Sequence, residues 1–411
     1  MSRELRIRAA ALRTCCDPLP ESCSRLFRLT SREWQRLLRW LDTSGLALYL
    51  FDRLLELQIA HLLPDDVLAR LERNRIDNAE RTRTMIDESG AIHRDFQRVG
   101  LSYATLKGFS LSPLSVSDPA LRSQLDLDFL VAERSAPAAR LILGDRGYRL
   151  HAVSGRSWEF KTPQSPGTSL KDLYKAVPYR CLELHLEADT PGRPSLLGRT
   201  EMQEFHGISM PVLSPADLFL GQGMHLYKHV FSEFLRAAHL VEFRRHVMAR
   251  RGDDAFWRGV RSIAERDPAA SRALGIVTLL VTQSIGEFAP QALTEWTVDR
   301  LPPTARLWVN TYGCRAALAQ FPGSKLYLLL QKELANSGIP ARRSLRRVLV
   351  PLKLPPAIVP TSTQENLTAR LRRYCLQIHF VLFRMRFHLV EGIRYAWESS
   401  RWQKLVSQLA R

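Results

Sequence analysis

Two aspartates separated by one residue, Asp126 and Asp128, are the residues best suited to chemistry in this chain. They lie in an apolar run over 125–131 that predicts a strand, so alternation places both carboxylates on one face and Leu127 and Phe129 on the other. Like charges side by side destabilise a fold unless a cation lies between them. Carboxylate oxygens suit Mg²⁺ or Mn²⁺, so the pair predicts a divalent metal site.

A second acidic segment alternates strictly over 181–187 and predicts a half-buried strand with Glu183 and His185 on its polar face. If the two strands are neighbours, Glu183 completes a three-carboxylate cluster with Asp126 and Asp128, and His185 lines the same cleft. Such clusters hold metal ions that bridge nucleotide phosphates and activate a hydroxyl for in-line attack. Taken alone, a segment such as Glu183-x-His185 is usually a solvated strand face.

A phosphate-binding turn is predicted at Lys107-Gly108, between a short β-prone segment and a helix that starts near Phe109. Glycine permits close approach of the backbone, helix N–H groups face an anion, and the lysine adds a positive charge. Arg122, four residues before the first aspartate, is a candidate clamp for the triphosphate or for pyrophosphate. A Lys-Gly pair after a strand is also a routine turn.

His225 and His229 are four residues apart in a predicted helix, which places them on one face and makes them a candidate zinc pair lining the cleft. No glutamate follows His225, so the metalloprotease pattern is absent. Packing between helices at a domain junction is the interpretation that we favour for the pair.

In this order, the motifs resemble the uncharacterised nucleotidyltransferase family of bacteria, within the polymerase-β-like superfamily. The resemblance covers about residues 45–250 and implies an α+β fold with a small mixed sheet between helical regions. It implies transfer of a nucleoside monophosphate from a nucleoside triphosphate such as ATP to an acceptor hydroxyl, with release of pyrophosphate. The segments that carry it are Leu106-Lys107-Gly108, Arg122-x-x-x-Asp126-x-Asp128, Leu182-Glu183-Leu184-His185 and Leu213-Ser214-Pro215-x-Asp217-Leu218 with His225 and His229.

By this resemblance, Asp126 and Asp128 are the paired metal ligands, Glu183 is the third carboxylate, and Lys107-Gly108 takes the place of a Gly-Ser nucleotide-binding turn. Leu125 stands where the superfamily commonly has glycine. These two departures motivate an alternative, a catalytically inactive binding or scaffold protein of the same fold. A third hypothesis is a nucleic-acid-binding protein that uses its basic C-terminal region.

The elements that position these residues divide the chain into successive regions. We predict a loosely ordered N-terminus over 1–26, helices over 27–98, the nucleotidyltransferase-like core over 99–212 and a helical domain over 213–350. A Pro-rich linker over 351–368 and a basic amphipathic helix over 369–411 follow, with the apolar face of that helix in the core. Within the N-terminal helices, Thr30 and Glu33 predict a capping box, and one long helix is predicted from Asp65 to Arg98.

The composition is that of an ordinary globular protein. Of 411 residues, 45% are hydrophobic and 24% charged, which excludes a disordered chain or a small disulfide scaffold. The net charge of +18 favours an anionic partner, either nucleic acid or a membrane surface, and residues 341–411 supply +11 of it from 14 basic and 3 acidic residues. Six cysteines without a CxxC pair, and the lack of a signal or transmembrane segment, predict a cytoplasmic protein.

Overall fold

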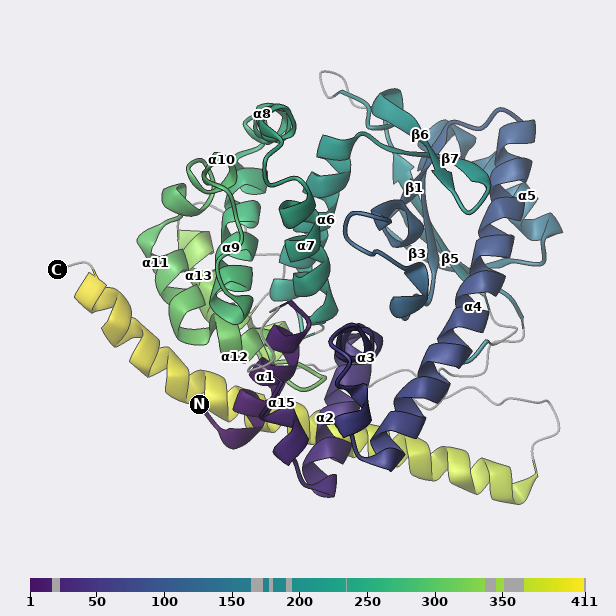
Figure 1. The fold of residues 1–411 in the computed structure, drawn as a ribbon. Helices are drawn as coiled ribbons and strands as arrows, with labels where there is room; N and C mark the ends of the chain where they lie inside the picture. The colour runs from purple at the N-terminus through teal and green to yellow at the C-terminus, as the bar shows by residue number, and fades with distance from the viewer. Residues whose placement is uncertain are drawn as a thin grey trace.

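The computed structural model shows a mixed β-sheet beside a larger helical body (Figure 1). The predicted fold class, a small mixed sheet flanked by helices, is confirmed. The structure describes residues 1–16, 23–163, 173–176, 180–189, 194–233, 235–336, 345–350 and 366–409.

The sheet has seven strands in the order β3-β4-β5-β2-β1-β7-β6. β2 lies parallel to β5 and antiparallel to β1, and β1 is parallel to β7. The two strands that carry the acidic motifs are therefore direct neighbours near the middle of the sheet. The strand bounds are Tyr103–Leu106 (β1), Leu127–Ala132 (β2), Arg149–Ser154 (β3), Ser157–Lys161 (β4), Cys181–Glu187 (β5), Thr200–Phe205 (β6) and Ile208–Leu213 (β7).

One face of the sheet is covered by α4 (Asp65–Arg98) and α5 (Ala136–Asp145). The alternation predicted over 181–187 is present, because every second residue of β5 is buried. These apolar side chains form a core with Phe96 of α4 and Phe129 of β2. The opposite, polar side of β5 is left for the functional side chains.

The N-terminal and C-terminal helices share one hydrophobic core, in which Trp34 and Trp40 belong to the same cluster as Phe243 and Trp257. The predicted capping box is confirmed at the start of α2, where Thr30 and Glu33 bond reciprocally, and Gly45 ends that helix with a left-handed φ of 74°. Besides residues from α4 and from a C-terminal helix, this core contains residues of α1 (Arg3–Thr14), α2 (Ser31–Ser44), α3 (Ala47–Glu56), α6 (Pro215–Val230), α7 (Ala238–Ala249), α8 (Asp254–Ala264), α9 (Pro268–Ile285), α10 (Gln291–Thr294), α11 (Pro303–Trp308), α12 (Cys314–Ala317) and α13 (Tyr327–Asn336).

The N-terminus differs from its prediction as a loosely ordered segment. Residues 3–14 form helix α1, capped by Ser2, and bury Ala11 and Leu12 completely. The arginines of this segment interrupt its apolar residues, so the sequence did not predict a helix. Arg8, for example, is buried because its guanidinium donates to the backbone oxygen of Leu318. Polar partners far along the chain thus allow a basic residue to lie in the core.

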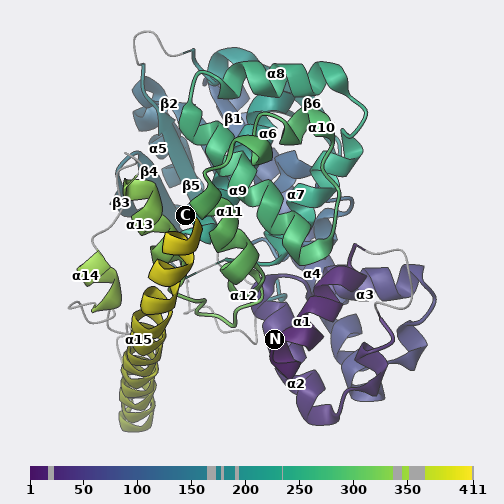
Figure 2. The ribbon, with the colours of Figure 1, turned by 90° about the vertical axis from the view of Figure 1, so that its left-hand side faces the viewer.

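A long helix, α15 (Leu367–Leu409), follows the short α14 (Leu345–Leu349). Its second half packs on the body, where Trp402 is buried and donates to Glu333. Its first half projects beyond the other helices (Figure 2), and apolar residues such as Ile378 and Met385 are exposed there. The prediction that this apolar face lies in the core is wrong for that half. The predicted linker lies almost wholly outside the described residues.

Among the described residues, none of the helices combines the length and the apolar character that are needed to span a lipid bilayer.

Candidate functional site

Asp128 and Glu183 lie side by side at the centre of the sheet. They are register partners on the parallel strands β2 and β5, so their side chains leave the same face. His185, two residues further along β5, emerges on that face as well. One potential ligand atom from each of the three lies within 4.8 Å of the others. The strand pairing thus brings together two predicted metal ligands and one predicted cleft residue.

Lys107 completes this cluster from the end of β1. Its Nζ lies 2.9 Å from Oδ1 of Asp128, and Nε2 of His185 lies 3.0 Å from the same oxygen. Burial disfavours both cations, but hydrogen bonds and the neighbouring carboxylates raise the pKa of Lys107 and the pKa of His185. Asp128 is only 6% exposed, and Lys107 and His185 are the hydrogen-bond partners of this buried carboxylate.

Glu183 is held by two neighbours. Nε2 of His185 lies 3.4 Å from Oε2 of Glu183, and the Ser157 hydroxyl donates to Oε1. The hydrogen bond from His185, together with the one from Ser157, lowers the pKa of Glu183 well below its usual range. Sequence reasoning missed Ser157, because the Gly, Ser, Pro and Lys residues over 154–178 predict a loop or an irregular hairpin rather than a strand of the site. It begins β4, where its register partner is His185.

Asp126 stands one residue before β2 rather than inside it. It does not belong to the group of close ligand atoms formed by Asp128, Glu183 and His185. Burial and the charge of Asp128 raise the pKa of Asp126 to about 6, with a further contribution from Glu183. The side-chain amide of Gln124 donates to the backbone oxygen of Asp126 at 2.8 Å and fixes the segment that carries it. The three predicted carboxylates therefore interact electrostatically, although only two share the tight cluster.

The Lys107-Gly108 turn is unusual in its backbone. Lys107 has φ of 53° and Gly108 has φ of 46°, and both values lie in the region that favours glycine. The Cβ of any side chain at position 108 would lie 2.5 Å from the Gln124 amide nitrogen. The helix predicted after this turn is only a 3₁₀ turn over Gly108–Leu111. Because this turn is only four residues long, it does not provide the dipole of a long helix that the predicted phosphate-binding turn included.

Arg122 lies against a protein carboxylate. Its Nε is 3.1 Å from Oε1 of Glu242 in α7, and its Nη1 donates to Gln124 at 3.3 Å. The Tyr49 hydroxyl of α3 donates to the same oxygen of Glu242 at 3.2 Å. Arg122, which we predicted to clamp phosphate, thus connects the segment before β2 to α7 directly and to α3 through Glu242. Its position in the sequence did not indicate these contacts.

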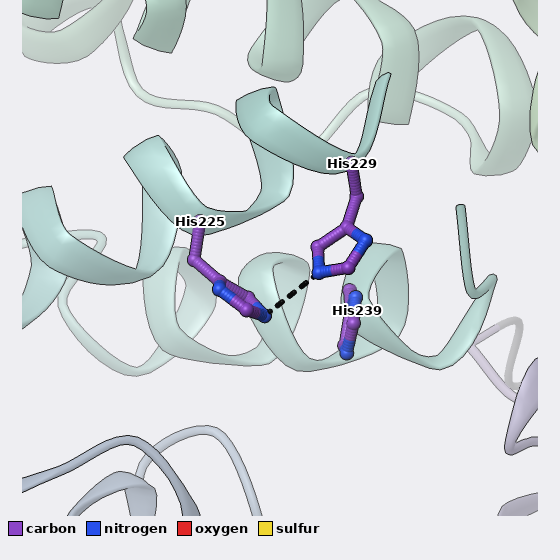
Figure 3. Close-up of side chains that lie close together, drawn as sticks. All are labelled: His225, His229 and His239. Atoms are coloured by element: carbon purple, nitrogen blue, oxygen red, sulfur yellow. Dashed lines mark hydrogen bonds between the residues drawn. The ribbon is translucent and has the colours of Figure 1, made fainter. Parts of the chain in front are cut away.

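His225 and His229 of α6 meet a third histidine, His239, at the start of α7 (Figure 3). The Nε2 atoms of His225 and His229 lie 3.1 Å apart, and the ring of His239 is 5.2 Å and 5.1 Å from theirs, centroid to centroid. Burial lowers the pKa of His225 to about 2 and the pKa of His239 far below its usual range. The positive charges of Lys107 and Arg122 contribute to the shift at His225, so the histidine cluster lies near the acidic one.

The Ser-Pro-x-Asp motif has a structural role in this fold. Ser214 caps α6 by accepting from the backbone N–H of Asp217. Both oxygens of Asp217 accept from Arg199, each at 2.9 Å, in a two-pronged ion pair. This pairing ties the helix with the histidines to the segment between β5 and β6.

The structure thus has a mixed sheet with a lysine at the end of β1, carboxylates on adjacent parallel strands and flanking helices, which agrees with the nucleotidyltransferase resemblance of the sequence. The model of a family described as "Uncharacterised nucleotidyltransferase" matches residues 30–286, and the chain belongs to this family. Nucleotidyl transfer is therefore the class of activity that the chain supports.

The structure is also similar to that of an antigenic nucleotidyltransferase-like protein from Paracoccidioides brasiliensis. The two sequences are 14% identical, the match covers 48% of this chain and 93% of that one, and the TM-score is 0.30. No curated protein matches the chain.

Proposed function

We propose that this chain transfers a nucleoside monophosphate from a nucleoside triphosphate to an acceptor hydroxyl and releases pyrophosphate. In this reaction the acceptor oxygen bonds to the α-phosphorus while the bond from that phosphorus to the β-phosphate oxygen breaks. The observation that carries the proposal is the pairing of Asp128 with Glu183 on adjacent parallel strands, together with family membership.

The donor set fits Mg²⁺ or Mn²⁺. Asp126, Asp128 and Glu183 offer hard carboxylate oxygens, and burial together with the charges of Asp128 and Glu183 raises the pKa of Asp126. When bound there, a divalent cation supplies positive charge to the nucleotide phosphates. Lys107 would then bind a phosphate oxygen. Its side chain is 29% exposed, and rotation of this side chain would move the ammonium group from Asp128 to the phosphate.

Asp128→Asn and Glu183→Gln test this proposal. Each substitution removes one negative ligand, and we expect the rate of nucleotide transfer from labelled triphosphates in the presence of Mn²⁺ to fall by about 100-fold or more. Glu201→Gln serves as a control, because Glu201 is an exposed carboxylate on β6 of the same sheet. The assignment fails if the Asp128 and Glu183 variants transfer nucleotide as fast as the control.

A second candidate function is nucleotide binding without turnover. The observation that favours it is that Lys107 and His185 both lie within hydrogen-bonding distance of Oδ1 of Asp128, so this carboxylate oxygen already has two partners from the protein. Calorimetry with a non-hydrolysable triphosphate and Mn²⁺ separates the two candidates. Binding that depends on Asp128, without transfer to any of a broad pool of acceptors, would establish the non-catalytic function.

We also propose that the first half of α15 docks on an anionic membrane surface. Residues 367–390 contain five arginines and no acidic residue. Leu371, Ile378, Met385 and Leu389 lie on one side of the helix and are each more than half exposed. Arginines beside exposed aliphatic side chains match a surface of anionic headgroups over hydrocarbon, whereas nucleic acid offers no partner for the aliphatic side chains.

A further inference from the structure

The histidine cluster on α6 and α7 has the composition of a transition-metal site. One ring nitrogen from each of His225, His229 and His239 lies within 4.8 Å of the other two. Imidazole is a preferred ligand of zinc and related metals, in contrast to the oxygen ligands that magnesium selects. Among the described residues, the two clusters of three side chains therefore differ in chemistry, one rich in oxygen and one in nitrogen.

The spacing agrees with coordination. Zinc–nitrogen bonds of the usual length in a tetrahedral site place two ligand nitrogens about 3.3 Å apart. The Nε2 atoms of His225 and His229 are 3.1 Å apart, so they need to separate only slightly. In Figure 3 the three rings gather in the space between the two helices, with His239 close to His229.

Hydrogen bonding accounts for only part of the cluster. His225 and His229 bond to each other, but Nδ1 of His239 has no hydrogen-bond partner among the described residues. His239 is 8% exposed, and buried polar atoms in native proteins are nearly always partnered. A metal ion in the cluster supplies a binding partner for this ring that the protein itself does not.

We propose that His225, His229 and His239 bind one zinc-class dication through three imidazole nitrogens. Three protein ligands leave one tetrahedral position for water or an anion. Lys107, Lys228, Arg122 and Arg236 act on these rings electrostatically, and their positive charge favours an anion such as phosphate in that position. The site is separate from the carboxylate cluster and does not depend on the proposed transfer activity.

Zinc content and affinity of the full chain test the site. After chelator treatment and removal of the chelator, we expect the protein to take up one zinc ion per chain in competition with a chromogenic chelator. His225→Gln, His229→Gln and His239→Gln should each weaken this binding by at least about 100-fold, because each removes a direct ligand. Substitution with Co²⁺ should give the absorption of a tetrahedral ion, and inorganic phosphate should change that spectrum.

Two further variants locate the metal. His246→Gln removes another buried histidine of α7, outside the cluster, and should retain full affinity. Asp128→Asn should also retain it, which separates this site from the carboxylate cluster. The proposal is overturned if the wild-type chain takes up no stoichiometric zinc, or if binding survives in the three cluster variants. Circular dichroism of the metal-free proteins checks that those variants are folded.

Discussion

At Gly108, a backbone conformation that favours glycine lies next to the residues that hold the acidic site. A Cβ there would meet the Gln124 amide, which holds the backbone of Asp126, and φ of 46° is strained for any other residue. We expect Gly108→Ala to reduce the free energy of unfolding by about 1 kcal/mol and kcat/KM by about 100-fold, since small displacements of reacting groups have such effects. Urea unfolding and steady-state kinetics measure the two changes.

Gly144→Ala is the matched control, because Gly144 lies in α5 with no atom within 4 Å of its added Cβ. That substitution should stabilise the protein by about 0.5–1 kcal/mol and leave activity unchanged. A Gly108→Ala enzyme with full activity would show that the turn does not position the acidic residues.

Residues of the site were predictable where one strand or one turn carries them. Strict alternation over 181–187 put Glu183 and His185 on one face, and the apolar run around Asp128 marked its strand. Ser157 and His239 were not predictable, because each reaches the site through pairing or packing between segments distant in sequence. Their own neighbours in the chain carry no pattern that indicates a partner.

The contact between α4 and β1 contains a buried histidine, His93. Its Nδ1 lies 2.8 Å from the Tyr103 hydroxyl and its Nε2 lies 3.3 Å from the Thr105 hydroxyl. Burial lowers the pKa of His93 to about 4. Because the folded-state pKa lies below the unfolded value of about 6.5, the stabilisation is complete above pH 6.5 and is lost as pH falls toward 4.

This shift makes the α4–β1 contact sensitive to acid. Between pH 7.5 and pH 5, His93 alone should reduce the free energy of unfolding by about 2 kcal/mol. His93→Gln should remove that portion of the pH dependence in urea titrations, whereas His61→Gln, at an exposed position, should keep it. Equal losses in wild type and His93→Gln would mean that other groups cause the acid sensitivity.

At the scale of elements, helix ends with local signals were predictable. α4 begins at Asp65 after Pro64 and ends at Arg98, as its sequence predicts. The sequence also predicts a helix from Leu46 to Leu63, and the structure has a shorter one: α3 ends at Glu56, and a 3₁₀ turn over Ala60–Leu62 follows. Local periodicity continues across both pieces, so only the tertiary packing decides where the helix stops.

At the scale of the whole molecule, Glu242 connects regions that the sequence presents as separate. It accepts from Tyr49 in the N-terminal helices and from Arg122 beside the sheet, while its own helix belongs to the C-terminal region. The two helical regions share one core around this contact. Division of the chain at 98 and 212 remains a prediction about sequence regions, while the packing joins the helices on both sides.

The proposed membrane contact of the exposed half of α15 can be tested with lipid vesicles. We expect the full chain to sediment with vesicles that contain phosphatidylserine, to bind pure phosphatidylcholine weakly, and to lose binding as salt rises. Ile378→Asn with Met385→Gln should weaken binding by about 10-fold or more, because two side chains no longer enter the hydrocarbon.

Leu141→Gln provides the control for that experiment, since Leu141 is 71% exposed on α5, away from α15. Both variants change only exposed residues, so their folding should match wild type, which leaves vesicle affinity as the property that separates them. Salt-sensitive binding to single-stranded nucleic acid without vesicle binding would identify a different anionic partner. A dimer in light scattering that the double variant disrupts would instead place a second copy of the chain on this helix, because either partner would cover the same aliphatic residues.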